Sequence, residues 1–400
     1  MFVFYVLLGV FFLPCFSFFY PFNINNHHSK KIPVLSMIFH KKNNIEDTYL
    51  EYLKDYNKLK VPSGNQFLNG FYSRFSKKQF YDEDKYKIFE KNYLFIQSEN
   101  EKLKENKDSF ELGFNEFFDK VPFDDTSVNV MNTPIQYNQS IYNKFEKYFQ
   151  NPLFYLNKLF NNNKTVNWNE TVYISPVKNQ GSCGSCWAFA TTSALEVFMR
   201  HHNYSVNRLS EQQLVDCSTE NFGCNGGYMD KAFDYIIANG GLLSDENYPY
   251  IAETMNCQSC ICNQNNVNHT FHTFSNNTKI HAKNVIGSGI KEYDYIISKS
   301  IFDICLSLQT SPITIAIDAS SYYFQFYKSG VLDVPNSPNM KLNHAVLLVG
   351  YGIDEKGLYW IIQNSWGSSW GDHGFCKIRV KEGEGVLLSN LYGVYPSKYK

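Results

Sequence analysis

The chain has 400 residues, of which 44% are hydrophobic and 19% are charged, so its composition is that of a globular protein. Its 37 basic and 38 acidic residues leave a formal net charge of -1, which argues against a simple basic nucleic-acid-binding protein. The composition also excludes a collagen and a polytopic membrane protein. The length predicts either two domains or one large unit with two lobes.

The first 20 residues are almost entirely apolar and carry no charge. A segment of this length is either a cleaved secretory signal peptide or an uncleaved membrane anchor. Cys15 and Ser17 offer small residues for cleavage, whereas the basic residues that normally precede a signal's apolar core are missing. We favour the cleaved signal over the anchor, and either one would bring the rest of the chain into the secretory pathway.

The number and the positions of the cysteines are typical of a protein that folds in an oxidising compartment. Cys15 would leave with a cleaved signal, and all the other cysteines lie beyond residue 182. Because their number is odd, we expect one free thiol beside paired ones. In that compartment the Asn-x-Ser/Thr sequons would accept glycans. These sequons begin at Asn138, Asn163, Asn169, Asn203, Asn268 and Asn276.

Residues 21–160 form a first region that contains no cysteine. Apolar side chains recur there at three- and four-residue steps over 81–104, which predicts an amphipathic helix. A glycine-initiated turn with an aromatic pair follows at 112–119. The segment 120–163 is rich in Asn and weakly periodic, as expected of an exposed linker that a protease could cut.

The second region begins with helices and continues with strands. A run without Gly or Pro predicts a helix from Cys186 to His202, and Ser210 is a suitable cap for a helix over 211–215. Apolar runs predict strands over 312–317, 344–349, 358–362 and 375–380. This order indicates an α+β fold in which a helical lobe packs on a β lobe, with a cleft between them.

One cysteine is suitably placed for nucleophilic chemistry. Cys186 lies in the first turn of a predicted helix, where the positive end of the backbone dipole favours a thiolate. A thiolate of this kind needs a base, for which His344 is a candidate, and Asn364 could orient the imidazole by accepting one of its N–H groups. The side-chain amide of Gln180 could donate to a developing oxyanion near the backbone N–H of Cys186.

The motif Gln180-Gly-Ser-Cys-Gly-Ser-Cys186-Trp, with the distant His344 and Asn364, closely resembles the papain-like cysteine proteases of the cathepsin L type. The resemblance covers about residues 165–396 and a segment before them. It implies a papain-like two-lobed α+β fold with Cys186 as nucleophile, His344 as base and imidazolium partner, Asn364 as orienting group and Gln180 as oxyanion donor. It further implies a monomeric endopeptidase that cleaves proteins or peptides without a cofactor or a metal.

The first region resembles the inhibitory propeptide of the same family. Its helix pattern is present, with a lysine where arginine is usual and a tyrosine where glutamate is usual: Tyr81, Lys85, Phe89, Asn92, Ile96 and Asn100. The Gly-x-Asn-x-Phe-x-Asp pattern follows at Gly113, Asn115, Phe117 and Asp119. The resemblance implies a signal peptide or anchor over 1–20, an inhibitory propeptide over 21–160 and a peptidase domain over 161–400. The propeptide would fill the cleft and leave on maturation, in a lysosome-like or vacuolar compartment or outside the cell.

The resemblance also implies substrate-binding residues: Gly226, Gly227, Tyr228, Met229, Leu342, Asn343, Ala345, Trp366 and Tyr392. The two glycines would leave room for the substrate backbone. The largely apolar lining predicts Leu, Val or Phe two residues before the scissile bond, and Tyr392 would shorten that pocket and disfavour Arg. The implied disulfides are Cys183–Cys224 and Cys217–Cys257, while the pairing of Cys260, Cys262, Cys305 and Cys376 stays open.

Other functional interpretations have less support in the sequence. His344 follows Cys186 at more than the spacing of about 130–150 residues usual in the family, which predicts a loop insertion over 258–286. Such an insertion could block the cleft of an exopeptidase, and a relative without activity could use the same fold to bind or inhibit. Cys183 and Cys186 alone could form a redox or zinc pair, and Cys257, Cys260 and Cys262 with His269 and His272 could bind metal. The complete set of catalytic groups favours an endopeptidase active on the acid side of neutral, with a propeptide released on acidification.

Overall fold

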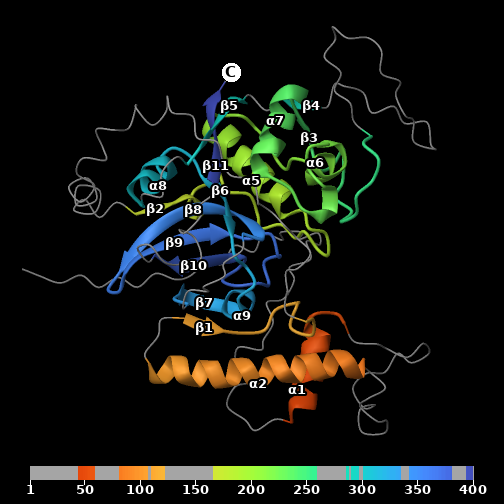
Figure 1. Ribbon diagram of the computed structural model, residues 1–400, viewed down its shortest axis with the longest axis vertical. Helices are drawn as coiled ribbons and strands as arrows, with labels where there is room; N and C mark the ends of the chain where they lie inside the picture. Colours follow the sequence, from red (N-terminus) through yellow and green to blue (C-terminus); the bar gives the residue numbers. More distant parts are fainter. Residues whose placement is uncertain are drawn as a thin grey trace, which may run out of the picture.

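The computed structural model describes residues 44–58, 81–106, 110–121, 165–258, 285–287, 290–296, 301–334, 342–380 and 393–399. The predicted signal peptide or anchor, Tyr392 and most of the predicted insertion over 258–286 lie outside these residues. Within the described ranges, no helix has both the length and the apolar character needed to cross a membrane. Figure 1 shows the N-terminal helices at one end, the β-sheet in the middle and the remaining large helices at the other end.

The described part of the N-terminal region contains α1 (Ile45–Asp55), α2 (Glu83–Glu105) and β1 (Phe110–Leu112). The predicted amphipathic helix is confirmed as α2, which begins after Asp82, whose carboxylate accepts from the N–H groups of Asp84 and Lys85. Phe89 on its buried face packs against Tyr49 of α1, with ring centroids 4.7 Å apart. The aromatic contact between the two helices belongs to the same buried apolar cluster as the core of the β lobe.

Two asparagines on the buried side of α2 hold the chain that follows it. Asn100 accepts from the Leu112 N–H and donates to the Leu112 carbonyl, both at 2.9 Å, so its amide pairs with β1 as a neighbouring strand would. The Asn92 side chain is fully buried and donates to the Phe118 carbonyl at 2.9 Å. These bonds fix the segment 110–118 on α2 because they satisfy backbone groups that would otherwise be buried without a partner.

The helical lobe contains α5 (Cys186–His201), α6 (Glu211–Cys217) and α7 (Met229–Asn239), with short 3₁₀ turns η3 (Trp168–Glu170) and η4 (Gly223–Asn225). The two predicted helices are confirmed, and Ser210 caps α6 by accepting from the Gln213 N–H at 2.9 Å. All of α5 from Cys186 to Met199 is buried. It is therefore the central helix of this lobe.

The β lobe is a sheet with strand order β1-β7-β10-β9-β8-β6-β11-β5, to which β2 (Val166–Asn167) adds beside β8. The strands are β5 (Ile290–Tyr295), β6 (Ile313–Ile317), β7 (Tyr327–Leu332), β8 (His344–Asp354), β9 (Gly357–Gln363), β10 (Phe375–Arg379) and β11 (Gly393–Tyr399). All pairs are antiparallel except β7 with β10. The four predicted strands are confirmed as β6, β8, β9 and β10. A separate pair is formed by β3 (Gly241–Leu243) and β4 (Val285–Gly287), and the short helices are α8 (Ile301–Leu308) and α9 (Tyr322–Gln325).

The two lobes meet where α5 packs on β8 and β6. Cys186 at the start of α5 and His344 at the start of β8 both lie at this junction. Residues of α5 and of β6 and β8, among them Ala194, Ala316 and Ala345, belong to one shared cluster of buried apolar side chains. The predicted α+β fold with two lobes is therefore confirmed, and the shared core sets the position of the junction.

Candidate active site

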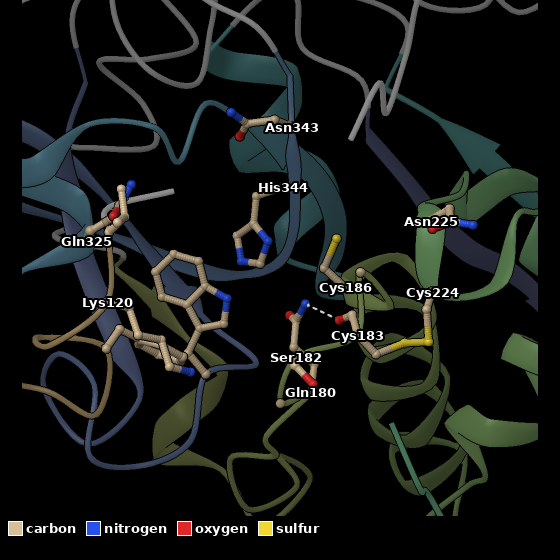
Figure 2. Close-up of a pocket in the computed structure, with 15 residues that line it drawn as sticks. Lys120, Gln180, Ser182, Cys183, Cys186, Cys224, Asn225, Gln325, Asn343 and His344 are labelled. Carbon is tan, nitrogen blue, oxygen red and sulfur yellow. Dashed lines mark hydrogen bonds between the residues drawn. A yellow bond between two sulfur atoms is a disulfide. The ribbon is translucent and has the colours of Figure 1, made fainter. Parts of the chain in front are cut away.

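A cavity of about 340 Å³ opens at the junction of the two lobes. Figure 2 shows His344 on one wall, Cys186 on the facing wall and Gln180 beneath them. The N-terminal region closes part of this cavity. Its described lining consists of Phe117, Lys120, Val121, Gln180, Gly181, Ser182, Cys183, Gly184, Cys186, Cys224, Asn225, Gln325, Asn343, His344 and Trp366.

The loop before Cys186 is held against η4 by a disulfide and by a close backbone contact. Cys183 is bonded to Cys224, and the Gly184 N–H donates to the Cys224 carbonyl at 2.9 Å. A Cβ atom at Gly184 would lie 2.5 Å from that carbonyl oxygen, so no other residue fits there without displacing the loop. Because Cys183 is bonded to Cys224, it does not form a redox pair with Cys186.

His344 is buried and its Nε2 lies 2.8 Å from Asn364 Oδ1. Because an amide oxygen only accepts, a neutral His344 carries its proton on Nε2, and Nδ1 is left as the acceptor. The Trp366 ring packs beside the imidazole, with ring centroids 4.8 Å apart. Burial lowers the pKa of His344 to about 4, against the opposing effect of the Asn364 bond, so this imidazole is neutral at neutral pH.

Gln180 is held by hydrogen bonds at both its backbone and its side chain. Its N–H donates to the Ser365 carbonyl at 2.8 Å, and its Oε1 accepts from the Ser365 hydroxyl at 2.6 Å. Its Nε2 donates to the Cys183 carbonyl at 3.0 Å, which is the dashed line in Figure 2. The structure thus brings Gln180, Cys186 and His344 to one cavity and places Asn364 behind His344.

Gly226 and Gly227, in the predicted backbone-binding stretch, each require glycine for a different structural reason. Gly226 has φ 110°, a conformation that favours glycine. A Cβ atom at Gly227 would lie 2.5 Å from Asn221 Oδ1 and 2.7 Å from the Trp187 ring, so packing alone requires glycine there. Packing therefore accounts for Gly227 without reference to a substrate.

Only some of the other predicted substrate-binding residues lie at the cavity. Asn343 and Trp366 line it, but the buried Asn343 side chain accepts from the Ala319 N–H at 2.8 Å and donates to Asp318 at 3.3 Å. Figure 2 shows this side chain pointing away from Cys186. The following residues are not among the described residues that line the cavity: Tyr228, Met229, Leu342 and Ala345. Met229 and Ala345 are fully buried.

The structure contains the disulfides that the resemblance implies, Cys183–Cys224 and Cys217–Cys257. Because Cys257 is bonded to Cys217, it is not available for the metal site considered above, whose other candidate residues lie outside the described ranges. Cys305 and Cys376 are buried free thiols, and burial raises the pKa of each well above its usual value. Neither of them lines the cavity, so among the described cysteines outside a disulfide it is Cys186 that lines it.

The N-terminal region reaches the cavity through an added strand. β1 pairs antiparallel with β7, and the Gly113 N–H then donates to the Phe326 carbonyl at 2.8 Å. Asn115 donates to the Gln325 carbonyl at 2.6 Å, and Phe117 packs edge-on against Trp366 with ring centroids 5.6 Å apart. These contacts place the end of the Gly113–Asp119 segment beside His344.

Several residues at the site were not found by sequence reasoning. Ser365, which fixes Gln180, follows Asn364 directly and could have been suspected from that position alone. Phe324 packs on Trp366 at 5.6 Å, and Gln325 lines the cavity from α9. Neither of these two carries a local sequence signal, because a four-residue helix in a long connection has no distinctive pattern.

Comparisons with known proteins agree with this geometry. The family model described as papain family cysteine protease matches residues 162–393. Cathepsin L1 of Drosophila melanogaster is 35% identical over 314 residues, which are 76% of this chain and 78% of that protein. Human cathepsin L2 is 36% identical over 297 residues, 73% of this chain and 79% of that one. Mouse cathepsin K is 39% identical over 219 residues, and the chain spans only 60% of its length.

Two solved precursors share the fold along most of the chain. The digestive procathepsin L 3 of the Tenebrio molitor larval midgut superposes with a TM-score of 0.64 at 26% identity, covering 89% of this chain and 100% of that one. The recombinant stem bromelain precursor superposes with a TM-score of 0.63 at 25% identity, covering 89% and 99%. The likeness therefore extends beyond the residues that the family model matches.

Proposed function

Because the chain belongs to the papain family of cysteine proteases, we propose that it is a cysteine endopeptidase synthesised as an inactive precursor. The observation that carries the proposal is the Asn364–His344 hydrogen bond of 2.8 Å beside a cavity that Cys186 and Gln180 also line. The nearness of these groups at the junction of the lobes supports one reaction, hydrolysis of an acyl bond through a thioester.

In the proposed reaction the Cys186 thiolate attacks the carbonyl carbon of the scissile peptide, and the carbonyl oxygen becomes an oxyanion. The Gln180 amide and the Cys186 backbone N–H stabilise that oxyanion. The oxyanion collapses, the C–N bond breaks, and the His344 imidazolium gives its proton to the leaving amine. His344 then takes a proton from the water that attacks the thioester, and the C–S bond breaks, which releases the carboxylic acid and restores the thiolate–imidazolium pair.

Asn364 keeps the His344 ring in the orientation that this proton transfer needs. The Nε2–H bond to Asn364 leaves Nδ1 as the nitrogen that exchanges the proton with Cys186. A neutral histidine cannot form the thiolate–imidazolium pair, and burial lowers the pKa of His344 to about 4 in this structure, where Phe117 of the N-terminal region packs on Trp366 beside it. We infer that displacing this region readmits water, raises that pKa and allows the pair to form.

The N-terminal region over 21–160 is then the inhibitory propeptide, residues 161–400 the peptidase domain and residues 1–20 the signal peptide or anchor. The pairing of β1 with β7 and the contact of Phe117 with Trp366 support this assignment. The two disulfides support passage through the secretory pathway to a lysosome-like or vacuolar compartment or to the outside.

The preference for a hydrophobic residue two positions before the scissile bond belongs to the same proposal. The expectation comes from the apolar character of Met229, Ala345 and Leu342, which pack in one apolar cluster and do not line the described cavity. A panel of fluorogenic peptides that differ only at this residue tests the preference. Leu should be cleaved much faster than Arg, and equal rates would contradict the expected pocket.

The reaction itself is tested by labelling the matured protein with an epoxide probe for papain-type thiols, beside Cys186→Ala. We expect labelling and peptide hydrolysis in the wild type and neither in Cys186→Ala. Cys305→Ala is a matched control, because this buried thiol has a raised pKa and lies away from the cavity. An unlabelled wild type whose N-terminal region has been removed would refute the proposed activity and favour a binding protein with the same fold.

A further inference from the structure

The phenol of Tyr250 connects the two ends of the loop that carries the proposed catalytic groups. Its hydroxyl donates to the Gln180 backbone carbonyl at 2.8 Å. The same oxygen lies 2.6 Å from the Ser185 hydroxyl, and Ser185 directly precedes Cys186. One atom of Tyr250 therefore contacts the residue of the proposed oxyanion donor and the neighbour of the proposed nucleophile.

The protons at this junction can be assigned from the available donors. A phenol has one proton, and a backbone carbonyl only accepts, so the Tyr250 proton lies toward Gln180. The Ser185 hydroxyl then donates to the phenol oxygen at 2.6 Å rather than to the Cys183 carbonyl, which lies farther away at 3.5 Å. Burial raises the pKa of Tyr250 to about 12, so the phenol keeps its proton throughout the pH range in which a papain-type enzyme can be assayed.

The Ser185 hydroxyl bonds to Tyr250 in place of the helix-capping hydrogen bond that a serine at this position commonly makes. A serine that precedes a helix usually accepts a hydrogen bond from the backbone of the first turn, as Ser210 does for Gln213 at 2.9 Å. Ser185 occupies the same position before α5, is fully buried and makes no such capping bond. Its hydroxyl is turned to Tyr250, so no serine oxygen offsets the positive end of the helix dipole beside Cys186.

Tyr250 is itself held rigidly. Its ring packs edge-on against Phe189 in α5, with centroids 4.8 Å apart. Its N–H donates to Asp245 at 3.4 Å, and the next residue, Ile251, donates its N–H to Gln212 of α6 at 3.0 Å. A group that is fixed on two helices can set a distance between the residues that it bonds.

We propose that Tyr250 is a positioning residue that sets the place of Gln180 relative to Cys186 through its shared bonds to the Gln180 carbonyl and the Ser185 hydroxyl. The proposal rests on the proposed function, in which Gln180 stabilises the oxyanion. Tyr250 touches neither substrate nor reacting atoms in this role. Its loss should therefore weaken stabilisation of the tetrahedral intermediate more than the intrinsic reactivity of the thiol.

The test compares two reactions of Cys186 in the enzyme matured from the full-length chain. A peptide aldehyde adds to the thiolate and forms a hemithioacetal whose oxygen occupies the oxyanion position. Iodoacetamide forms an S–C bond with loss of iodide and creates no oxyanion. Tyr250→Phe removes the hydroxyl and keeps the ring on Phe189, whereas Ser185→Ala removes the same bridge from its other side.

Tyr248→Phe is the matched control. Its hydroxyl donates to Asp216 at 2.8 Å in the same segment, and it does not line the cavity. Loss of that bond would report the general effect of removing one phenol from this segment. All rates are normalised to titrated active sites, and thermal unfolding of each variant is recorded.

We expect Tyr250→Phe to lower kcat and to raise the aldehyde inhibition constant by about 10- to 100-fold, the scale on which misplaced catalytic groups lower rates. KM and the alkylation rate should change by no more than about twofold, since neither depends on the oxyanion donor. Ser185→Ala should shift the aldehyde constant in the same direction, and the double variant should be no worse than Tyr250→Phe, because both changes remove one bridge.

The proposal is overturned if Tyr250→Phe binds the aldehyde as tightly as the wild type does, or as tightly as Tyr248→Phe does. It is also overturned if aldehyde affinity and alkylation rate fall by the same factor, which would show a general disturbance of the cleft. Failure of the proposed function looks different, because the wild type itself would then neither hydrolyse peptides nor react selectively at Cys186.

Discussion

Asn115 joins the N-terminal region to the β lobe at the edge of the cavity. Its side chain is buried, its Nδ2 donates to the Gln325 carbonyl at 2.6 Å and its Oδ1 accepts from the Phe117 N–H at 3.0 Å. The first bond docks the segment, and the second holds the turn that places Phe117 on Trp366. Replacing Asn115 by Ala should therefore open the cavity without changing the peptidase domain.

The size of the effect follows from the groups that lose partners. The Gln325 carbonyl keeps a second donor, the Trp370 indole N–H at 3.1 Å, whereas the half-buried Phe117 N–H loses its acceptor. A fully buried donor without a partner costs about 1–3 kcal/mol, so the half-buried Phe117 N–H should cost about 1–2 kcal/mol. Because 1.4 kcal/mol is a factor of ten, the open fraction of the precursor should rise by about 5- to 30-fold.

The assay is the initial rate at which an epoxide probe labels the uncleaved precursor at neutral pH, read on a gel as label at the precursor mass. Glu111→Gln is the matched control, since its ion pair with Lys328, at 3.1 Å, joins β1 of the same docked segment to β7 but is partly exposed to solvent. Exposed pairs contribute about 0–1 kcal/mol, so this variant should label nearly as the wild type does.

The reasoning fails if Asn115→Ala labels within about twofold of the wild-type precursor, a change smaller than the loss of one buried hydrogen bond predicts. It also fails if Glu111→Gln accelerates labelling more than Asn115→Ala, because the docking would then depend on surface charge.

Three further predictions concern the site and its support. Asn364→Ala should lower kcat of the matured enzyme by about 10- to 100-fold, because an unoriented His344 transfers its proton poorly; a normal kcat would show that Trp366 alone orients the ring. The pKa of His344 is depressed from 6.5 to about 4 in the closed precursor, so below pH 6.5 the unfolded chain binds a proton at His344 that the folded precursor does not bind. The free energy of unfolding should therefore fall by about 1.4 kcal/mol for each pH unit below 6.5, until about pH 4, and should not depend on His344 above pH 6.5. Thermal unfolding of the Cys186→Ala precursor should therefore lose more stability on acidification than Cys186→Ala/His344→Gln, and parallel curves would contradict this. Lys178→Met leaves the buried Glu211 without its cation and leaves Glu196 with only Arg200, at 4.0 Å, and should cost about 3–5 kcal/mol in urea unfolding, whereas a loss below about 1 kcal/mol would mean that Glu211 is protonated.

The predicted elements that the structure confirms all have local causes. The helix of α2 follows from its apolar spacing and from the Asp82 cap, and α6 begins at a serine that caps it. The strands β6, β8 and β9 are apolar runs of ordinary strand length. The placement of Cys186 at the start of α5 is local in the same sense, because helix formation begins where the glycine-containing loop ends.

The hydrogen bond that Ser185 makes cannot be predicted from the neighbouring sequence. Its position before α5 favours a helix cap, as at Ser210, yet its hydroxyl bonds to Tyr250, which is 65 residues away in the sequence. The Ser185 hydroxyl bonds to the distant Tyr250 phenol because the two hydroxyls meet inside the protein, where buried polar groups need hydrogen-bond partners. The family resemblance assigns roles to Gln180 and Asn364, but it contains no information about the hydroxyl of Ser365 that fixes Gln180.

The amino-acid sequence by itself predicted the helices α2, α5 and α6, the strands β6, β8, β9 and β10, the two-lobed class and the candidate nucleophile, base, orienting group and oxyanion donor. Periodicity, caps and motif spacing act over a few residues, so they can be recognised without the fold. The tertiary structure alone decided that β1 adds to β7, that Phe117 covers Trp366 and that Tyr250 joins Gln180 to Ser185. Those contacts join residues tens to hundreds of positions apart, and their partners are selected by which buried groups the packed lobes leave to be satisfied.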